Sequence, residues 1–198
     1  MFDFKKEEKS LYPTTSAPSI VDVPTMAFLM TDGVGDPNTS PAYEAAIEAL
    51  YGLSYAIKMG HKQTLEFVVP PLEGYWRGDP ASKDEFAWTL AIRQPDFVTS
   101  EVLDAAKAAL AKRKPKLDVT SVRLEQMTEG WCVQALHIGP YDDEPATIAV
   151  MSQYAADHGY QEDEDGARRH HEIYLSDPRR TAPDKLKTII RHPVKVAA

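Results

Sequence analysis

The sequence predicts an α+β fold built from one strand-and-helix unit that is used twice. Strand segments, a helix and two further strands are expected in that order over 19–96 and again over 117–198. Part of the match is literal, because Ile92-Arg93-Gln94-Pro95 corresponds to Ile190-Arg191-His192-Pro193. Two such units would form a curved antiparallel sheet with helices on one face and a concave ligand cleft on the other.

The whole chain is expected to form a single domain, since 198 residues can bury a sizeable core. Its expected parts are a polar N-terminal arm, a first repeat, a connecting helix and a second repeat, at 1–18, 19–96, 97–116 and 117–198.

Elements of the first repeat follow from hydrophobic periodicity and from stop signals. Pro24 cannot donate to a strand ladder, so it is expected to separate two strands. Ser40 is a good N-cap and Pro41 a good first helical residue. The expected elements are strands at 19–23 and 25–30, a helix at 41–59, a strand at 65–69, a loop or short strand at 72–79 and a strand at 86–93.

The second repeat is expected to follow the same plan. Leu65–Pro70 in the first repeat is aligned with His171–Ser176 in the second. The expected elements are strands at 119–127 and 131–138 around a turn at 128–130, a helix at 144–158, an acidic loop at 161–166, a strand beginning at His170, a short helical segment at 183–186 and a strand at 188–191.

The strand that begins at His170 carries the candidate chemistry. Side chains alternate between the two faces of a strand, so Ile173 shares one face with His171, and Glu172 shares the other with Tyr174. A carboxylate beside a phenol could bind a ligand or transfer a proton if that face lines a cavity. The alternative is a half-solvated strand with an ordinary surface glutamate.

Composition excludes several classes of function. The formal net charge is −8 and the basic clusters are small, which is a poor basis for binding nucleic acid. No apolar run approaches the length of a membrane span, and the N-terminus is charged, so a cytoplasmic protein without a membrane partner is expected. The oligomeric state is not predictable from the sequence.

No metal site and no cofactor are expected. Cys132 is the only cysteine, so a disulfide or a cysteine-based zinc site is not predicted. His170 and His171 are adjacent on a strand and face opposite ways, and His158 and His192 stand singly in the sequence. The run at 161–166 lacks the spacing of a calcium loop.

Several motifs together resemble the GyrI-like small-molecule-binding family. The two most specific are Val69-Pro70-Pro71-Leu72-Glu73-Gly74 with Trp76, and the segment from His171 to Arg179. Leu11-Tyr12-Pro13 and the segments 33–38 and 55–58 extend the resemblance along the chain. The resemblance implies a stand-alone member, with a duplicated SHS2-type β-α-β-β module and a ligand cleft between its halves.

The same resemblance suggests what the cleft does. Relatives include effector domains of multidrug-sensing regulators, in which a buried glutamate and aromatic residues accept lipophilic cations. The first hypothesis is therefore binding of lipophilic aromatic small molecules, for sequestration or sensing. The alternative is hydrolysis of cyclopropanoid, DNA-alkylating natural products by the same glutamate. A third, weaker hypothesis is protein-protein inhibition of the DNA gyrase type.

Six residues are the site candidates under either of the first two hypotheses. Desolvation would raise the pKa of a carboxyl group among aromatic rings and suit it to general acid or base catalysis. Glu172 and Tyr174 are the catalytic candidates, as base and as donor to a developing oxyanion. The ligand-binding candidates are Trp76, Glu73, Tyr55 and Tyr141.

Overall fold

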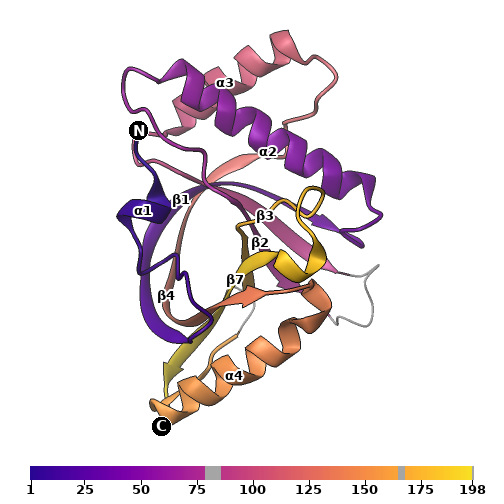
Figure 1. The fold of residues 1–198 in the computed structure, drawn as a ribbon. Helices are drawn as coiled ribbons and strands as arrows, with labels where there is room; N and C mark the ends of the chain where they lie inside the picture. The colour runs from indigo at the N-terminus through magenta and orange to yellow at the C-terminus, as the bar shows by residue number, and fades with distance from the viewer. Residues whose placement is uncertain (79–85, 165–167, 198) are drawn as a thin grey trace. The chain divides into compact units, whose positions relative to one another are not determined.

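The computed structural model describes residues 1–78, 86–164 and 168–197 (Figure 1). It divides into two compact units, of which unit 1 comprises Met1–Glu7 and Met26–Met127, and unit 2 comprises Glu8–Thr25 and Thr128–Ala198. Both units combine antiparallel strands with helices, which confirms the α+β class. No helix in the described part of the chain is long and apolar enough to cross a membrane.

In unit 1, strand β3 (Ala87–Gln94) is antiparallel to β2 (Leu72–Arg77) on one side and to the second half of β1 (Ser19–Val34) on the other. The first half of β1, up to Thr25, belongs to unit 2. Helix α2 (Pro41–Gly60) begins as predicted, because the Ser40 hydroxyl accepts a hydrogen bond from the Tyr43 backbone N–H at 3.4 Å. Its buried side chains Leu50, Leu53 and Ile57 recur at helical spacing and form much of its inner face.

Helix α3 (Ser100–Arg113) also belongs to unit 1, where it lies beside α2 (Figure 1). The two helices approach closely at Gly52, since a Cβ added there would lie 3.1 Å from the Leu110 side chain. The helix predicted at 97–116 therefore packs against α2 within unit 1.

In unit 2, strand β7 (Lys187–Val196) is antiparallel to the second half of β4 (Arg123–Ile138), to β6 (His170–Tyr174) and to the short β5 (Tyr160–Glu162). The start of β4, up to Met127, belongs to unit 1. Helix α4 (Glu144–Asp157) follows a 3-10 turn, η2 (Tyr141–Asp143). Met151 and Ala155 on α4 are buried with apolar residues of the strands, namely Val133, Ala135, Ile190 and Val194.

Strand order is the same in both units, β1-β3-β2 in one and β4-β7-β6 in the other. If Ile92 is matched with Ile190, their neighbours Leu72 and Glu172 occupy the same register position. On this match the counterpart of β6 would be β2, so the strand pairing does not support the alignment of Leu65–Pro70 with His171–Ser176.

Residues 65–69 do not form a strand of the sheet. Only Phe67 makes a β-bridge, which is parallel and joins it to Phe2 near the N-terminus. The Phe2 N–H donates to the Glu66 carbonyl at 2.7 Å, and the Val68 N–H donates to the Phe2 carbonyl at 2.8 Å. This segment pairs with the start of the chain, which periodicity within the segment could not reveal.

Two predicted breaks are also wrong, because β1 runs through Pro24 and β4 runs through Glu129 and Gly130. Pro24 is exposed, and a proline is tolerated in a strand where no ladder bond from its nitrogen is needed. Gly130 has a φ of +66°, which glycine adopts without strain, so the chain bends there while the strand continues. The acidic run predicted as a loop begins inside β5.

The N-terminal segment is not simply a polar arm. It contains the short helix α1 (Phe4–Glu7). A further short helical turn, η3 (Pro183–Lys185), precedes β7 near the other end of the chain. Phe4, Leu11 and Tyr12 are buried. Residues 8–25 belong to unit 2, so this segment contributes to the core that holds the candidate site.

Candidate functional site

The candidate site lies on one face of β6 in unit 2. His171 and Ile173 are buried on the opposite face, which confirms the predicted alternation. The site face carries His170, Glu172 and Tyr174. The Glu172 side chain is only 12% exposed, so this glutamate is not an ordinary surface residue.

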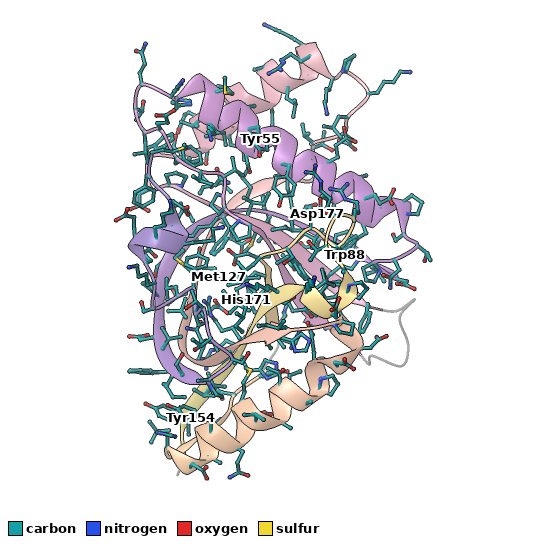
Figure 2. The ribbon with its side chains drawn as sticks, in the orientation of Figure 1. Tyr55, Trp88, Met127, Tyr154, His171 and Asp177 are labelled. Atoms are coloured by element: carbon teal, nitrogen blue, oxygen red, sulfur yellow. The ribbon has the colours of Figure 1, made fainter. Side chains whose placement is uncertain are left out.

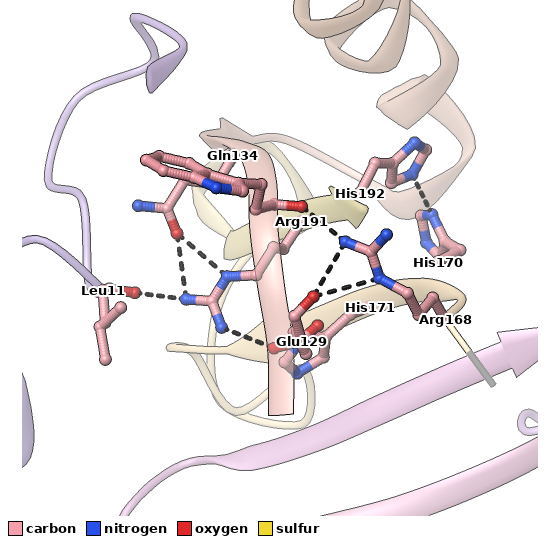
Figure 3. A network of polar contacts seen from close by, with 9 residues as sticks. Leu11, Glu129, Gln134, Arg168, His170, His171, Arg191 and His192 are labelled. Atoms are coloured by element: carbon pink, nitrogen blue, oxygen red, sulfur yellow. Dashed lines mark hydrogen bonds and ion pairs between the residues drawn. The ribbon is translucent and has the colours of Figure 1, made fainter. Parts of the chain in front are cut away.

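A chain of hydrogen bonds links the imidazoles to Glu172. His170 lies between His192 and Glu172. Its Nδ1 is 2.6 Å from His192 Nε2 (Figure 3), and its Nε2 is 2.8 Å from Glu172 Oε1. His192 Nδ1 lies 3.5 Å from a carboxylate oxygen of Glu164. Burial, and then the charge of His170, lowers the pKa of His192 to about 3, so His192 is a neutral acceptor for the His170 N–H.

A second carboxyl group, that of Glu144, joins Glu172 from the start of α4. Glu144 is 6% exposed and forms a hydrogen bond with Glu172. Burial raises the pKa of the Glu144 carboxyl well above its usual range, and the charge of Glu172 adds to this effect. Two buried carboxyl groups in contact do not both ionise, so Glu144 holds a proton beside the Glu172 carboxylate.

Two tyrosines border this carboxyl pair. The rings of Tyr141 and Tyr174 meet edge to face with centroids 6.0 Å apart. Burial raises the pKa of Tyr141 to about 12, and the negative charge of Glu172 contributes. Tyr141 is therefore a neutral phenol at physiological pH and able to donate a hydrogen bond.

The remaining predicted residues lie in unit 1. Glu73 and Trp76 are both on β2, where Glu73 is buried and Trp76 stacks on Tyr43 at a centroid distance of 6.0 Å. Tyr55 lies on α2 (Figure 2), is 52% exposed and stacks on Tyr51. Their assignment to ligand binding stays a prediction.

A separate polar network holds the other face of β6 in place. Arg191, fully buried on β7, donates to Glu129, to Gln134 and to the Leu11 carbonyl at 2.7–3.1 Å (Figure 3). Glu129 also accepts from His171 Nδ1 at 3.0 Å. These contacts join four segments of unit 2 and thereby position β6 without reaching its site face.

Sequence reasoning missed Glu144, His170 and His192. His170 could have been found, since it precedes Glu172 by two residues and shares its strand face. His192 follows from the register, because His171 pairs with Arg191 and so His170 and His192 lie at the adjoining position. The prediction that His192 stands singly is therefore wrong, because it is hydrogen-bonded to His170. Glu144 carries no such signal, because only the packing of α4 places it there.

Two carboxyl groups, a histidine pair and two tyrosines lie together at one strand face, an arrangement that is suited to binding a small molecule. The family model of the GyrI-like small molecule binding domain matches residues 16–195, and the chain belongs to this family. The chain is thus a small-molecule-binding domain.

Solved structures agree with this assignment. The chain is similar to an uncharacterized conserved protein from Listeria innocua, with 45% identity and a TM-score of 0.94 over 98% of this chain and 100% of that one. It is also similar to a hydrolase from Listeria innocua, with 46% identity and a TM-score of 0.92 over 98% and 100% of the two chains.

The EcmrR C-terminal domain has the same fold, with 11% identity and a TM-score of 0.54 over 91% of this chain and 98% of that one. The search of curated proteins finds no match.

Proposed function

We propose that this protein hydrolyses an electrophilic small molecule at the site face of β6. The observation that carries the proposal is the Glu144–Glu172 pair, a protonated carboxyl group held against a carboxylate. Such a pair offers a general acid and a general base at the same pH. The similarity to a protein described as a hydrolase supports the same class of reaction.

In this proposal Glu172 is the general base. It removes a proton from a water molecule, and the water oxygen forms a bond to an electrophilic carbon of the substrate. His170 is hydrogen-bonded to Glu172 and to His192, so it orients the carboxylate and stabilises its charge. The role assigned to Tyr174 is donation of a hydrogen bond to the oxygen on which negative charge develops, and Tyr141 is placed to assist.

The substrate class that we propose is the cyclopropane-bearing electrophile suggested by the family resemblance. Attack of water on a ring carbon breaks one carbon–carbon bond. The electron pair of that bond passes to the conjugated carbonyl oxygen, which becomes a phenolate and takes up the proton that Glu144 holds. The proton abstracted by Glu172 balances this transfer, so the pair is returned to its initial charge.

Binding without turnover is the competing function, in sequestration or sensing of lipophilic aromatic ligands. It is favoured by the tyrosine pair beside the carboxyl groups, since aromatic faces and a negative charge both attract a cation. Trp76, Glu73 and Tyr55 are proposed ligand contacts under both functions.

The proposal extends to the architecture. We propose that the chain consists of two SHS2-type modules that arose by duplication, with a concave ligand cleft. The shared strand orders β1-β3-β2 and β4-β7-β6 support the duplication.

Incubation with a spirocyclopropyl dienone tests the proposed reaction. We expect catalytic formation of the ring-opened, water-added product, followed by mass spectrometry. Glu172→Gln keeps the shape of the side chain but removes the base, so the rate should fall by about 10²–10⁴-fold. Glu162→Gln is the matched control on exposed β5 and should retain wild-type turnover.

Two outcomes would contradict the proposal. Turnover that survives in Glu172→Gln removes Glu172 as the base. Stoichiometric binding of the dienone by the wild-type protein without any product establishes sequestration instead of hydrolysis.

A further inference from the structure

The site face of β6 has a second property, which does not depend on whether the protein is a hydrolase. We propose that Glu144, His170 and Glu172 bind one divalent transition-metal ion of the zinc class. Each residue offers one donor atom, and the three atoms all lie within 4.8 Å of one another. One imidazole nitrogen with two carboxylate oxygens is a donor set that suits Zn²⁺ better than Mg²⁺ or Ca²⁺, which prefer oxygen alone.

Geometry allows the three side chains to share an ion. Zinc bonds to nitrogen and oxygen are about 2.0–2.2 Å long, so two ligands of one ion lie up to about 4 Å apart. Both glutamates can close the remaining gap by rotating their side chains, while β6 and α4 stay in place. The side chains of His170 and Glu172 are 20% and 12% exposed, and Glu144 is 6% exposed, so bulk water competes weakly for the ion.

A buried atom without a partner is a second, independent observation in favour of a cation site. Glu144 Oε1 is buried and has no hydrogen-bond partner within the described residues. Leaving such an acceptor unpaired is unfavourable, because the oxygen has lost its hydrogen bonds to water. A bound metal ion would satisfy this oxygen and take the place of the proton that Glu144 and Glu172 share.

The surroundings of His170 match those of a metal-bound histidine. Such a histidine usually donates the N–H of its other ring nitrogen to a neighbouring acceptor, which fixes the orientation of the ring. His170 Nδ1 lies 2.6 Å from His192 Nε2, and His192 Nδ1 lies 3.5 Å from Glu164 Oε1. With Nδ1 engaged in this way, Nε2 is the nitrogen that faces the carboxyl groups, 2.8 Å from Glu172 Oε1, and on losing its proton it would offer its lone pair to the ion.

Charge balance favours a divalent ion. If both glutamates are ionised they bring two negative charges, and His170 as a ligand is neutral. One Zn²⁺ neutralises the pair, and its three protein ligands leave a coordination position for water or for a ligand oxygen. The site would therefore select ligands that carry a metal-binding oxygen.

Isothermal titration of the chelator-treated full chain with Zn²⁺ tests this site. We expect one ion per chain, and Co²⁺ should give the visible absorption bands of a bound, low-symmetry ion. Glu144→Gln and His170→Ala should each weaken Zn²⁺ binding more than 100-fold. His192→Ala removes only the supporting hydrogen bond and should weaken binding about 10–100-fold. His158→Ala, at an exposed histidine of the same unit, is the matched control and should bind as the wild type does.

The graded losses distinguish this site from adventitious binding at surface histidines. Wild-type protein that fails to bind Zn²⁺ overturns the proposal. Equal affinity in the wild type, Glu144→Gln and His170→Ala overturns it as well. Circular dichroism of each variant shows that the fold is retained, and Glu144→Gln should not be less stable, because it removes the need to bury a carboxyl group. Since binding is measured without a substrate, the result is independent of whether the protein hydrolyses a dienone.

Discussion

At the scale of single residues, two carboxyl groups of unit 2 have pKa values that are shifted in opposite directions. Glu144 is desolvated beside Glu172 and keeps its proton. Glu129 is equally buried, and burial raises its pKa, but the positive charges of His171 and Arg191 outweigh this effect and lower the pKa to about 2. Only Glu129 has cations in contact with it, so it stays ionised and stabilises the fold. Glu144 keeps a proton that it could donate to a ligand.

Glu129 should make the stability of unit 2 depend on pH. Its folded-state pKa of about 2 lies below the ordinary value of 4.5, so its contribution is complete above the ordinary value and is lost as the pH falls toward 2. This pKa shift corresponds to a contribution on the order of 3 kcal/mol to the free energy of unfolding at neutral pH. Urea denaturation at pH 7, 4 and 2.5 should show a steeper loss of stability in the wild type than in Glu129→Gln.

Glu162→Gln, at an exposed carboxylate, is the control for that experiment and should lose stability as steeply as the wild type. An unchanged pH slope in Glu129→Gln would show that other groups govern acid unfolding.

At the scale of elements, close packing explains two glycines that look alike in sequence. Gly33 on β1 lies under the buried Trp88 of β3, whose indole ring also meets Tyr43 of α2 edge to face. A Cβ at position 33 would lie 2.1 Å from the Trp88 side chain. Gly60, the last residue of α2, has open space around it.

Gly33→Ala should therefore destabilise unit 1, and Gly60→Ala should not. Overpacking of a core typically costs about 1–3 kcal/mol, because a buried ring has to shift. At Gly60 an alanine meets no atom and restricts the unfolded chain, which should stabilise the protein by about 0.4–1 kcal/mol. Chemical denaturation of the two variants measures the difference, and equal stability of both would contradict the packing described here.

At the scale of the whole molecule, residues 8–25 complete the core of unit 2 from the other end of the chain. The Leu11 carbonyl accepts a hydrogen bond from buried Arg191, and the Ser10 carbonyl accepts one from Gln134. The polar sequence of residues 1–18 did not predict this role. Their contacts with the buried side chains of unit 2 are made by backbone carbonyls, which every residue type carries.

Leu11→Ala should be as damaging as a substitution in the centre of the core. Leu11 is buried, and truncation of a buried leucine costs about 2–5 kcal/mol. Val150→Ala, at an exposed position of α4, should change stability by less than about 0.5 kcal/mol. Thermal unfolding of the two variants compares them, and a Leu11→Ala protein as stable as the wild type would show that the N-terminal segment is dispensable.

Much of the fold was readable from local pattern. Helical spacing and the Ser40 cap located α2, and a period of two assigned Glu172 and Tyr174 to one face of β6. Strand ends were less predictable, since β1 continues through Pro24 and residues 65–69 pair with Phe2. Local signals report what a segment prefers, whereas its partner decides whether a ladder forms.

The amino-acid sequence was sufficient for the α+β class and for the family, and for predicting that Glu172 and Tyr174 share a strand face, because these depend on periodicity and on contiguous motifs. Folding was needed to bring Glu144 from α4 and His192 from β7 to that glutamate. Residue spacing determines which face of a strand a side chain occupies, but the groups across from it are set by strand register and helix packing. Those neighbours determine which carboxyl group keeps its proton and whether the pair could hold a metal ion.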